Sequence, residues 1–133
     1  MKRSTQDIIQ SFFKNLSEKN LNELINLFSE KVDWYIPGDD SKAPWLGRRT
    51  TKQEISEFYQ LLWQYTEPVL VKLDHVFIDN NKAVISGEFS TKMLQTNKVV
   101  DSLFFIQIEI ENELIVKYRL LEDTMVVANA LTL

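Results

Sequence analysis

The 133-residue sequence contains no cysteine, one histidine, three glycines and three prolines. Without cysteine the chain forms neither a disulfide nor a thiolate nucleophile, and one histidine falls short of the ligands that a zinc site needs. No run of about 18 apolar residues is present to form a membrane-spanning helix. The net charge of −4 opposes nucleic acid as a partner, because phosphate binding requires a basic surface. These absences predict a cytoplasmic protein that binds no metal, nucleic acid or membrane.

What the sequence does contain is ordinary for a globular protein, with 44% hydrophobic and 26% charged residues. Its length fits one domain over residues 1–133 and is sufficient to bury a core. The first half places apolar residues at helical spacing over residues 8–16, 21–28 and 55–62. Three helices are therefore expected, and Ser4, Asn20 and Thr51 are the residues that cap their starts.

A short aromatic strand is expected between the second and third helices, and a longer series of strands after the third. Residues 32–37 predict the short strand, which ends at a Pro-Gly turn. Alternating apolar residues over 69–77, 83–91, 99–111 and 114–121 predict four strands, whose short connections favour an antiparallel meander. A short helix capped by Asp123 is expected to follow. We therefore predict an α+β fold in which three N-terminal helices pack on a strongly curved antiparallel sheet and leave a cone-shaped pocket.

Several short motifs give the chain a resemblance to a known superfamily. They are an opening helical hairpin, Asp33-Trp34-Tyr35-Ile36-Pro37-Gly38, Pro44-Trp45-Leu46-Gly47-Arg48, and a final Ile115-x-x-x-Arg119-x-x-x-Asp123. In order and spacing these motifs resemble the nuclear transport factor 2-like superfamily, in its SnoaL-like branch, over nearly the whole chain. The resemblance implies a curved sheet, a cone-shaped pocket and a homodimer packed through the outer face of the sheet.

The catalytic patterns of this superfamily match less well than its shape. Ile36 stands where ketosteroid isomerases carry an aspartate base, and Phe12 and Phe13 stand where a tyrosine would help an oxyanion site. The Arg-x-Asp of limonene epoxide hydrolase and the several histidines of scytalone dehydratase are missing. The resemblance to polyketide cyclases implies a late aspartate as general acid, and either Asp123 or Asp101 could take that place.

Asp123 and Arg119 form the first candidate site, because they share strand parity near the end of the last strand. A carboxyl group among aromatic side chains has a raised pKa and can exchange protons near neutral pH. The structural alternative is an ion pair that orients the tail, with Asp123 as a helix cap.

His75 and Asp101 are the other catalytic candidates. A neutral imidazole among Val, Leu and Phe residues could exchange a proton with a ligand, although a single histidine on an apolar face is more often a core residue. Asp101 reaches the pocket mouth only if its strand twists or bulges near its start; otherwise it points outward, which we favour.

Large aromatic side chains are the expected lining of the pocket, because they bury much area and suit a flat hydrophobic ligand. With Arg119, the predicted ligand-binding residues are Trp34, Tyr35, Trp45, Tyr59, Trp63 and Tyr118. The alternative is an ordinary core position, which is favoured for Trp63 and Tyr118. Trp34, Tyr35 and Trp45 belong to the turn at the predicted mouth.

Three functions remain compatible with the sequence. One is an enzyme of the isomerase, cyclase or hydrolase kind that acts on an apolar small molecule by carboxylate acid/base chemistry without a cofactor. The second is a non-catalytic protein that binds such a molecule, and the third is a dimerisation module whose pocket is filled. An ionisable group inside an open pocket would favour the enzyme.

Overall fold

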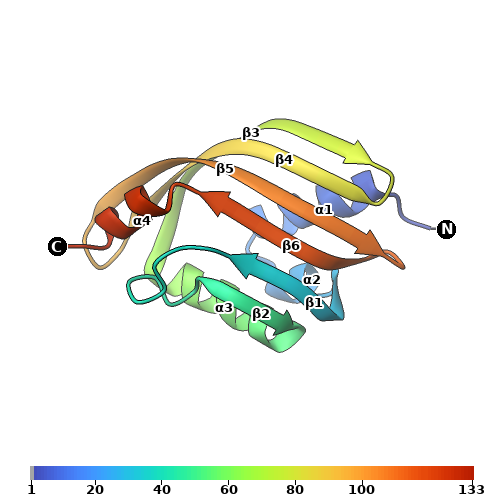
Figure 1. Ribbon diagram of the computed structural model, residues 1–133, viewed down its shortest axis with the longest axis horizontal. Coiled ribbons are helices and arrows are strands. Elements are labelled where there is room, and N and C mark those ends of the chain that lie inside the picture. Colours follow the sequence, from blue (N-terminus) through green and yellow to red (C-terminus); the bar gives the residue numbers. More distant parts are fainter. Residues whose placement is uncertain (1) are drawn as a thin grey trace.

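The computed structural model describes residues 2–133 and confirms an α+β architecture of helices and a curved, unclosed sheet (Figure 1). In chain order the elements are α1 (Thr5–Ser17), α2 (Leu21–Ile25), β1 (Phe28–Ile36), β2 (Gly47–Thr51), α3 (Lys52–Tyr65), β3 (Thr66–Asp79), β4 (Lys82–Met93), β5 (Lys98–Glu111), β6 (Leu114–Glu122) and α4 (Thr124–Ala130). Ser4, Asn20 and Thr51 cap the first three helices, as predicted. None of the helices within residues 2–133 is long and apolar enough to cross a membrane.

The six strands form one sheet in the order β2-β1-β6-β5-β4-β3. The antiparallel meander from β3 to β6 is confirmed, but the sheet as a whole is mixed because β1 pairs with β6 in parallel. Strand β2 was not predicted: four of its five residues are polar and the fifth is glycine, and it forms a strand because it pairs with the edge of β1. Helix α2 ends at Ile25, and Phe28 begins β1 instead of extending the predicted helical stripe. A fourth helix, α4, follows the sheet.

The sheet bends where its edge strand is irregular. Strand β3 shifts register against β4 between Pro68 and Leu70, and again between Leu73 and His75. A bulge of this kind bends a strand and increases its twist. Gly87 lies opposite Leu73, where a larger residue would meet the backbone of β3 and the ring of Phe104. The bent sheet curves around the layer that contains α1, α2 and α3 (Figure 1).

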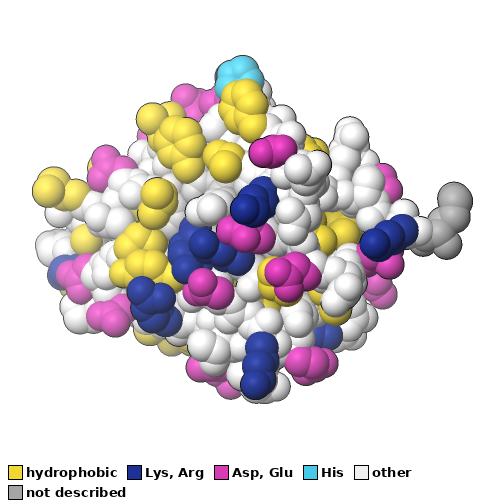
Figure 2. Space-filling view, turned by 45° about the vertical axis from the view of Figure 1, so that its right-hand side comes forward, with side chains coloured by type: hydrophobic (Ala, Val, Ile, Leu, Met, Phe, Trp, Pro, Cys, Tyr) yellow, Lys and Arg dark blue, Asp and Glu magenta, His cyan; other side chains and the backbone are white. Residues whose placement is uncertain are grey.

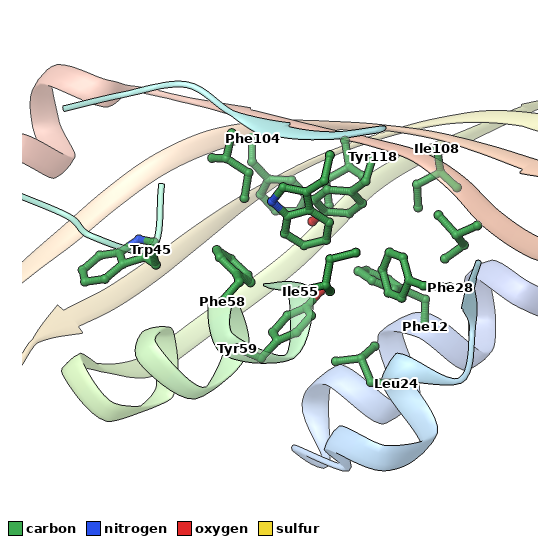
Figure 3. Packing of buried hydrophobic residues seen from close by; sticks show 14 of the residues in the cluster. Phe12, Leu24, Phe28, Trp45, Ile55, Phe58, Tyr59, Phe104, Ile108 and Tyr118 are labelled. Atoms are coloured by element: carbon green, nitrogen blue, oxygen red, sulfur yellow. The ribbon is translucent and has the colours of Figure 1, made fainter. Parts of the chain in front are cut away.

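An aromatic core fills most of the space between this layer and the sheet. Trp34 of β1 stacks on Tyr118 of β6 with ring centroids 4.2 Å apart, and Phe58 of α3 meets Trp34 edge-on at 4.9 Å. Phe12 and Phe28 continue the cluster toward α1 and α2 (Figure 3). Trp45 lies apart from this group on the other side of Phe58 (Figure 3). The core is therefore dense near β1 and β6 and stops short of the region around Trp45.

Candidate functional site

Beyond this core lies a cavity of about 570 Å³. Its walls come from α1, α3, the inner faces of β3, β4 and β6, and α4, and most of its lining is apolar. Apolar residues that line it include Phe13, Leu62, Trp63, Phe89, Leu120 and Met93. The mouth is identified by lining residues that are exposed to solvent. Among them are Ser17 at the end of α1, Lys19 just after it, and Val69, Leu70 and Val71 near the start of β3. A cavity of this size holds a small organic molecule.

Glu122, the last residue of β6, is the acidic residue among the described residues that line this cavity. Its side chain forms no salt bridge or side-chain hydrogen bond with residues 2–133. Burial among apolar side chains disfavours the charged form and raises the pKa of Glu122 to about 7. The cavity thus contains a carboxyl group that both accepts and donates protons near neutral pH.

Asp123 and Arg119 both lie outside the cavity lining. The Asp123 carboxylate caps α4 by accepting a hydrogen bond from the amide of Val126 at 3.1 Å, which is the structural alternative considered for it. The Arg119 guanidinium donates to both carboxylate oxygens of Asp33, each at 2.8 Å. The hydrogen bond and charge of Arg119 lower the pKa of Asp33. The expected pairing of Arg119 with Asp123 is therefore wrong, because its partner is on β1.

His75 and Asp101 are exposed and do not line the cavity either. His75 lies on β3 beside Phe77, with ring centroids 5.6 Å apart, and the histidine is visible at the surface in Figure 2. Asp101 points outward from β5, as favoured from the sequence, and accepts a short hydrogen bond from the Ser90 hydroxyl on β4. Neither residue contributes a polar group to the cavity.

Among the predicted aromatic lining residues, the structure brings Trp45 and Trp63 to the cavity. Trp34, Tyr59 and Tyr118 are packed in the aromatic core. Of these three, only Tyr118 was expected in the core from the sequence. Burial strongly raises the pKa of both Tyr59 and Tyr118, so these phenols remain neutral at physiological pH.

Tyr35 lies on the outer face of the sheet, where the guanidinium of Arg48 sits 4.4 Å from its ring centroid. It pairs in register with Arg119 of β6, so this part of the outer face is polar. Tyr35 therefore takes no part in the lining of the cavity.

Glu122 was the residue that sequence reasoning missed. The signal was present in the alternation of β6: Tyr118 is buried, and Leu120 and Glu122 follow it at intervals of two, whereas Arg119 and Asp123 have the opposite parity. Successive side chains of a strand point to opposite faces of the sheet. Reading the inner face from Tyr118 would have selected Glu122 over its neighbour.

The sequence and fold both show similarity to known proteins. Residues 9–118 match the model of the SnoaL-like domain. No protein with a curated description matches the sequence.

Several solved structures share the fold over nearly the whole chain. A nuclear transport factor 2-like protein from Burkholderia xenovorans has a TM-score of 0.88 at 16% identity, covering 99% of this chain and 100% of its own. A protein provisionally assigned as an isomerase from Rhodopseudomonas palustris has a TM-score of 0.83 at 17% identity, with 98% and 97% covered. TerC, which was co-crystallised with polyporic acid, has a TM-score of 0.81 at 12% identity, with 96% and 97% covered. At these identities the likeness shows the fold alone.

Proposed function

This chain belongs to the SnoaL-like domain family, and we propose that it binds a flat, apolar small molecule in the cavity and exchanges a proton with it through Glu122. The observation that carries this proposal is a carboxyl group with a pKa of about 7 in an apolar cavity. General acid–base catalysis is most effective when the pKa of the catalytic group lies near the operating pH. The reaction class is proton transfer at carbon or oxygen, as in an isomerase or cyclase, and it requires no cofactor.

The lining of the cavity supports a flat ligand. Trp45 and Trp63 contribute large planar surfaces, and Phe13 and Phe89 add two more rings. Planar aromatic side chains offer large contact areas to planar ligands at low entropic cost. The co-crystallisation of the fold neighbour TerC with polyporic acid is consistent with a small-molecule ligand in this fold.

The alternative is a protein that binds the same ligand without transforming it, and Glu122→Gln separates the two. We expect the wild type to accelerate the exchange of the α-protons of 2-tetralone, a flat apolar ketone, for deuterium in D₂O, as followed by proton NMR. Because glutamine cannot accept the proton, the variant is expected to catalyse this exchange about tenfold more slowly than the wild type. This factor is below the usual range for acid–base catalysis, because the probe is not the natural ligand.

Val71→Trp is the matched test of location. Val71 is 54% exposed at the mouth, so a larger side chain there is expected to obstruct entry without disturbing the core. This variant should also lose the exchange activity. If wild type and Glu122→Gln bind tetralone and exchange its protons at equal rates, the binding proposal stands and the catalytic proposal is contradicted.

We also propose that a second copy of the chain covers the apolar part of the outer sheet face. The exposed apolar residues of this part lie on four neighbouring strands and are Phe77, Val84, Val99, Leu103, Phe105 and Leu121. Leu103 and Phe105 of the central strand β5 are 59% and 51% exposed. Figure 2 shows hydrophobic side chains beside the histidine and charged side chains of both signs near the middle of the view. Large apolar side chains exposed on one face of a sheet are typical of an interaction site, and a symmetric dimer is the commonest assembly.

Sedimentation velocity tests the dimer. The wild type is expected to sediment as a dimer at micromolar concentration, and Phe105→Arg as a folded monomer. The arginine places a charge in the buried face between Ser86 and Leu121, its cross-strand neighbours, and neither of them is a carboxylate. Glu111→Arg, at the hairpin end of β5 and outside the apolar residues named above, is the control and should remain dimeric. A monomeric wild type would contradict the proposal.

A further inference from the structure

A single lysine stands at the mouth of the cavity, and no feature described so far explains it. Lys19 is the basic residue among the described residues that line the cavity, which is otherwise apolar apart from Ser17, Thr66, Thr91 and Glu122. Its ammonium lies 6.0 Å from the ring centroid of Trp63. Within residues 2–133 no carboxylate forms a salt bridge with it. The positive charge is thus directed toward a wall of the cavity and is available to a ligand.

Lys19 also occupies a backbone position that favours a different residue. Helix α1 ends in a Schellman motif, in which the amide of Lys19 donates to Leu16 O at 3.2 Å and that of Asn20 to Asn15 O at 2.9 Å. The residue at this point adopts a left-handed conformation, and φ of Lys19 is 53°. Glycine is the usual residue there, because a side chain makes this conformation unfavourable.

Three of the other four non-glycine residues with positive φ are asparagines, which tolerate the left-handed region well: Asn80, Asn97 and Asn112. The fourth is Glu113, whose carboxylate accepts a hydrogen bond from the amide of Arg3 at 2.5 Å. Lys19 thus has an unfavourable conformation without a side-chain hydrogen bond among the described residues to offset it. An outlier of this kind at a cavity mouth points to a functional use of the side chain.

Lys19 does not serve as the counter-ion of Glu122. The raised pKa of Glu122 arises from burial alone, and a nearby ammonium would have lowered it. No salt bridge joins the two side chains; Glu122 is partly buried, and Lys19 is exposed at the mouth. A ligand that used both would be apolar through its middle, would react at the inner end and would be negatively charged at the outer end.

We propose that Lys19 selects ligands with an anionic group, such as a carboxylate, sulfonate or acidic hydroxyl, by binding that group at the mouth while the apolar body fills the cavity. This inference rests on the proposed function, because it requires that the cavity bind an apolar ligand. It adds the chemical class of that ligand: a flat amphipathic acid. At an exposed rim, an ion pair contributes modestly to affinity and is weakened by salt.

Two dyes with the same ring system test whether Lys19 selects anionic ligands. 1-Anilinonaphthalene-8-sulfonate carries a negative charge, and N-phenyl-1-naphthylamine is the same molecule without the sulfonate. At low ionic strength, Lys19→Gln is expected to bind the sulfonate dye about fivefold more weakly than the wild type and the neutral dye equally well, as measured by fluorescence titration. In about 1 M NaCl the difference should disappear, because the Debye length falls to about 3 Å.

Matched variants distinguish the possible failures. Lys14→Gln removes the same charge from an exposed position on α1 that does not line the cavity, and it should bind both dyes as the wild type does. Val71→Trp should lose both dyes, which assigns them to the cavity and not to the outer sheet face. Lys19→Gly should weaken the sulfonate dye as Lys19→Gln does and raise Tm by about 3 °C, because it relieves the left-handed conformation.

The inference is overturned if Lys19→Gln leaves the sulfonate dye unaffected or weakens both dyes equally, since the lysine would then only shape the rim. If the wild type binds neither dye, the proposed function fails and this inference fails with it. If the wild type binds both dyes with the same affinity and Lys19→Gln changes neither affinity, the selection of anions is refuted and the proposed binding function stands.

Discussion

Replacement of Glu122 by glutamine is expected to stabilise the protein by about 2 to 3 kcal/mol at pH 8.5 and to leave its stability unchanged at pH 4. The pKa of this carboxyl rises from its ordinary 4.5 to about 7 on folding, because burial disfavours the charged form. Below pH 4.5 the group is protonated in both states and contributes no penalty. Between pH 4.5 and 7 the unfolded chain releases the proton first, so stability falls as pH rises. Above pH 7 the full penalty is present, and glutamine removes it.

Chemical denaturation at the two pH values measures this difference, with the variant compared to the wild type at each pH. All other titrating groups are common to both proteins and cancel in the comparison. Glu57→Gln is the control, because Glu57 is exposed on α3, away from the outer sheet face, and its replacement is expected to change stability by less than about 0.5 kcal/mol at either pH. A Glu122→Gln effect that is the same at pH 4 and pH 8.5 would show that Glu122 titrates normally in the folded protein, and the proton-transfer proposal would lose its basis.

Glu122 also shows that the alternation of side chains along a strand determines which residue faces the cavity. The sequence pattern predicted strand β6 and the helix cap that follows it, and it placed a candidate acid at the end of this strand. Glu122 and Asp123 are adjacent, however, and adjacent strand residues face opposite sides of the sheet. Asp123 was chosen because it shares strand parity with Arg119, and the structure shows that its carboxylate caps α4. The buried position of Tyr118, four residues earlier, fixes the parity and selects Glu122.

Elements with strong local signals were predictable, and elements formed by tertiary pairing were not. The capping residues Ser4 and Thr51 fixed two helix starts, and apolar alternation fixed β3 to β6. Strand β2 has no apolar alternation and exists through its hydrogen bonds to β1. The assignment of aromatic residues to core or cavity also depends on packing: Trp34 and Trp63 are similar in type, yet one stacks on Tyr118 and the other lines the cavity.

The cavity itself depends on the bend of the sheet, and Gly87→Ala is expected to destabilise the protein by about 3 kcal/mol, or about 10 °C in Tm. A Cβ atom at this position would overlap the backbone oxygen of Lys72 on β3 and would lie 2.6 Å from Cζ of Phe104. A phenyl ring can rotate away, but a backbone oxygen in a paired strand can move only if β3 moves. Leu73, opposite Gly87, lies next to the bulge that bends β3, so the substitution strains the strand that forms the cavity mouth.

Thermal unfolding followed by circular dichroism measures the loss of stability, and titration with N-phenyl-1-naphthylamine at a temperature well below Tm measures the cavity. Ser86→Ala, at the preceding position on β4, adds no atoms and is expected to change Tm by less than about 2 °C. We expect Gly87→Ala to weaken the neutral dye, because displacement of β3 alters the rim at Val71 and Leu73. A variant with wild-type Tm and wild-type dye affinity would show that β3 yields at little cost, and the bend could not then be attributed to the close approach of the two strands at Gly87.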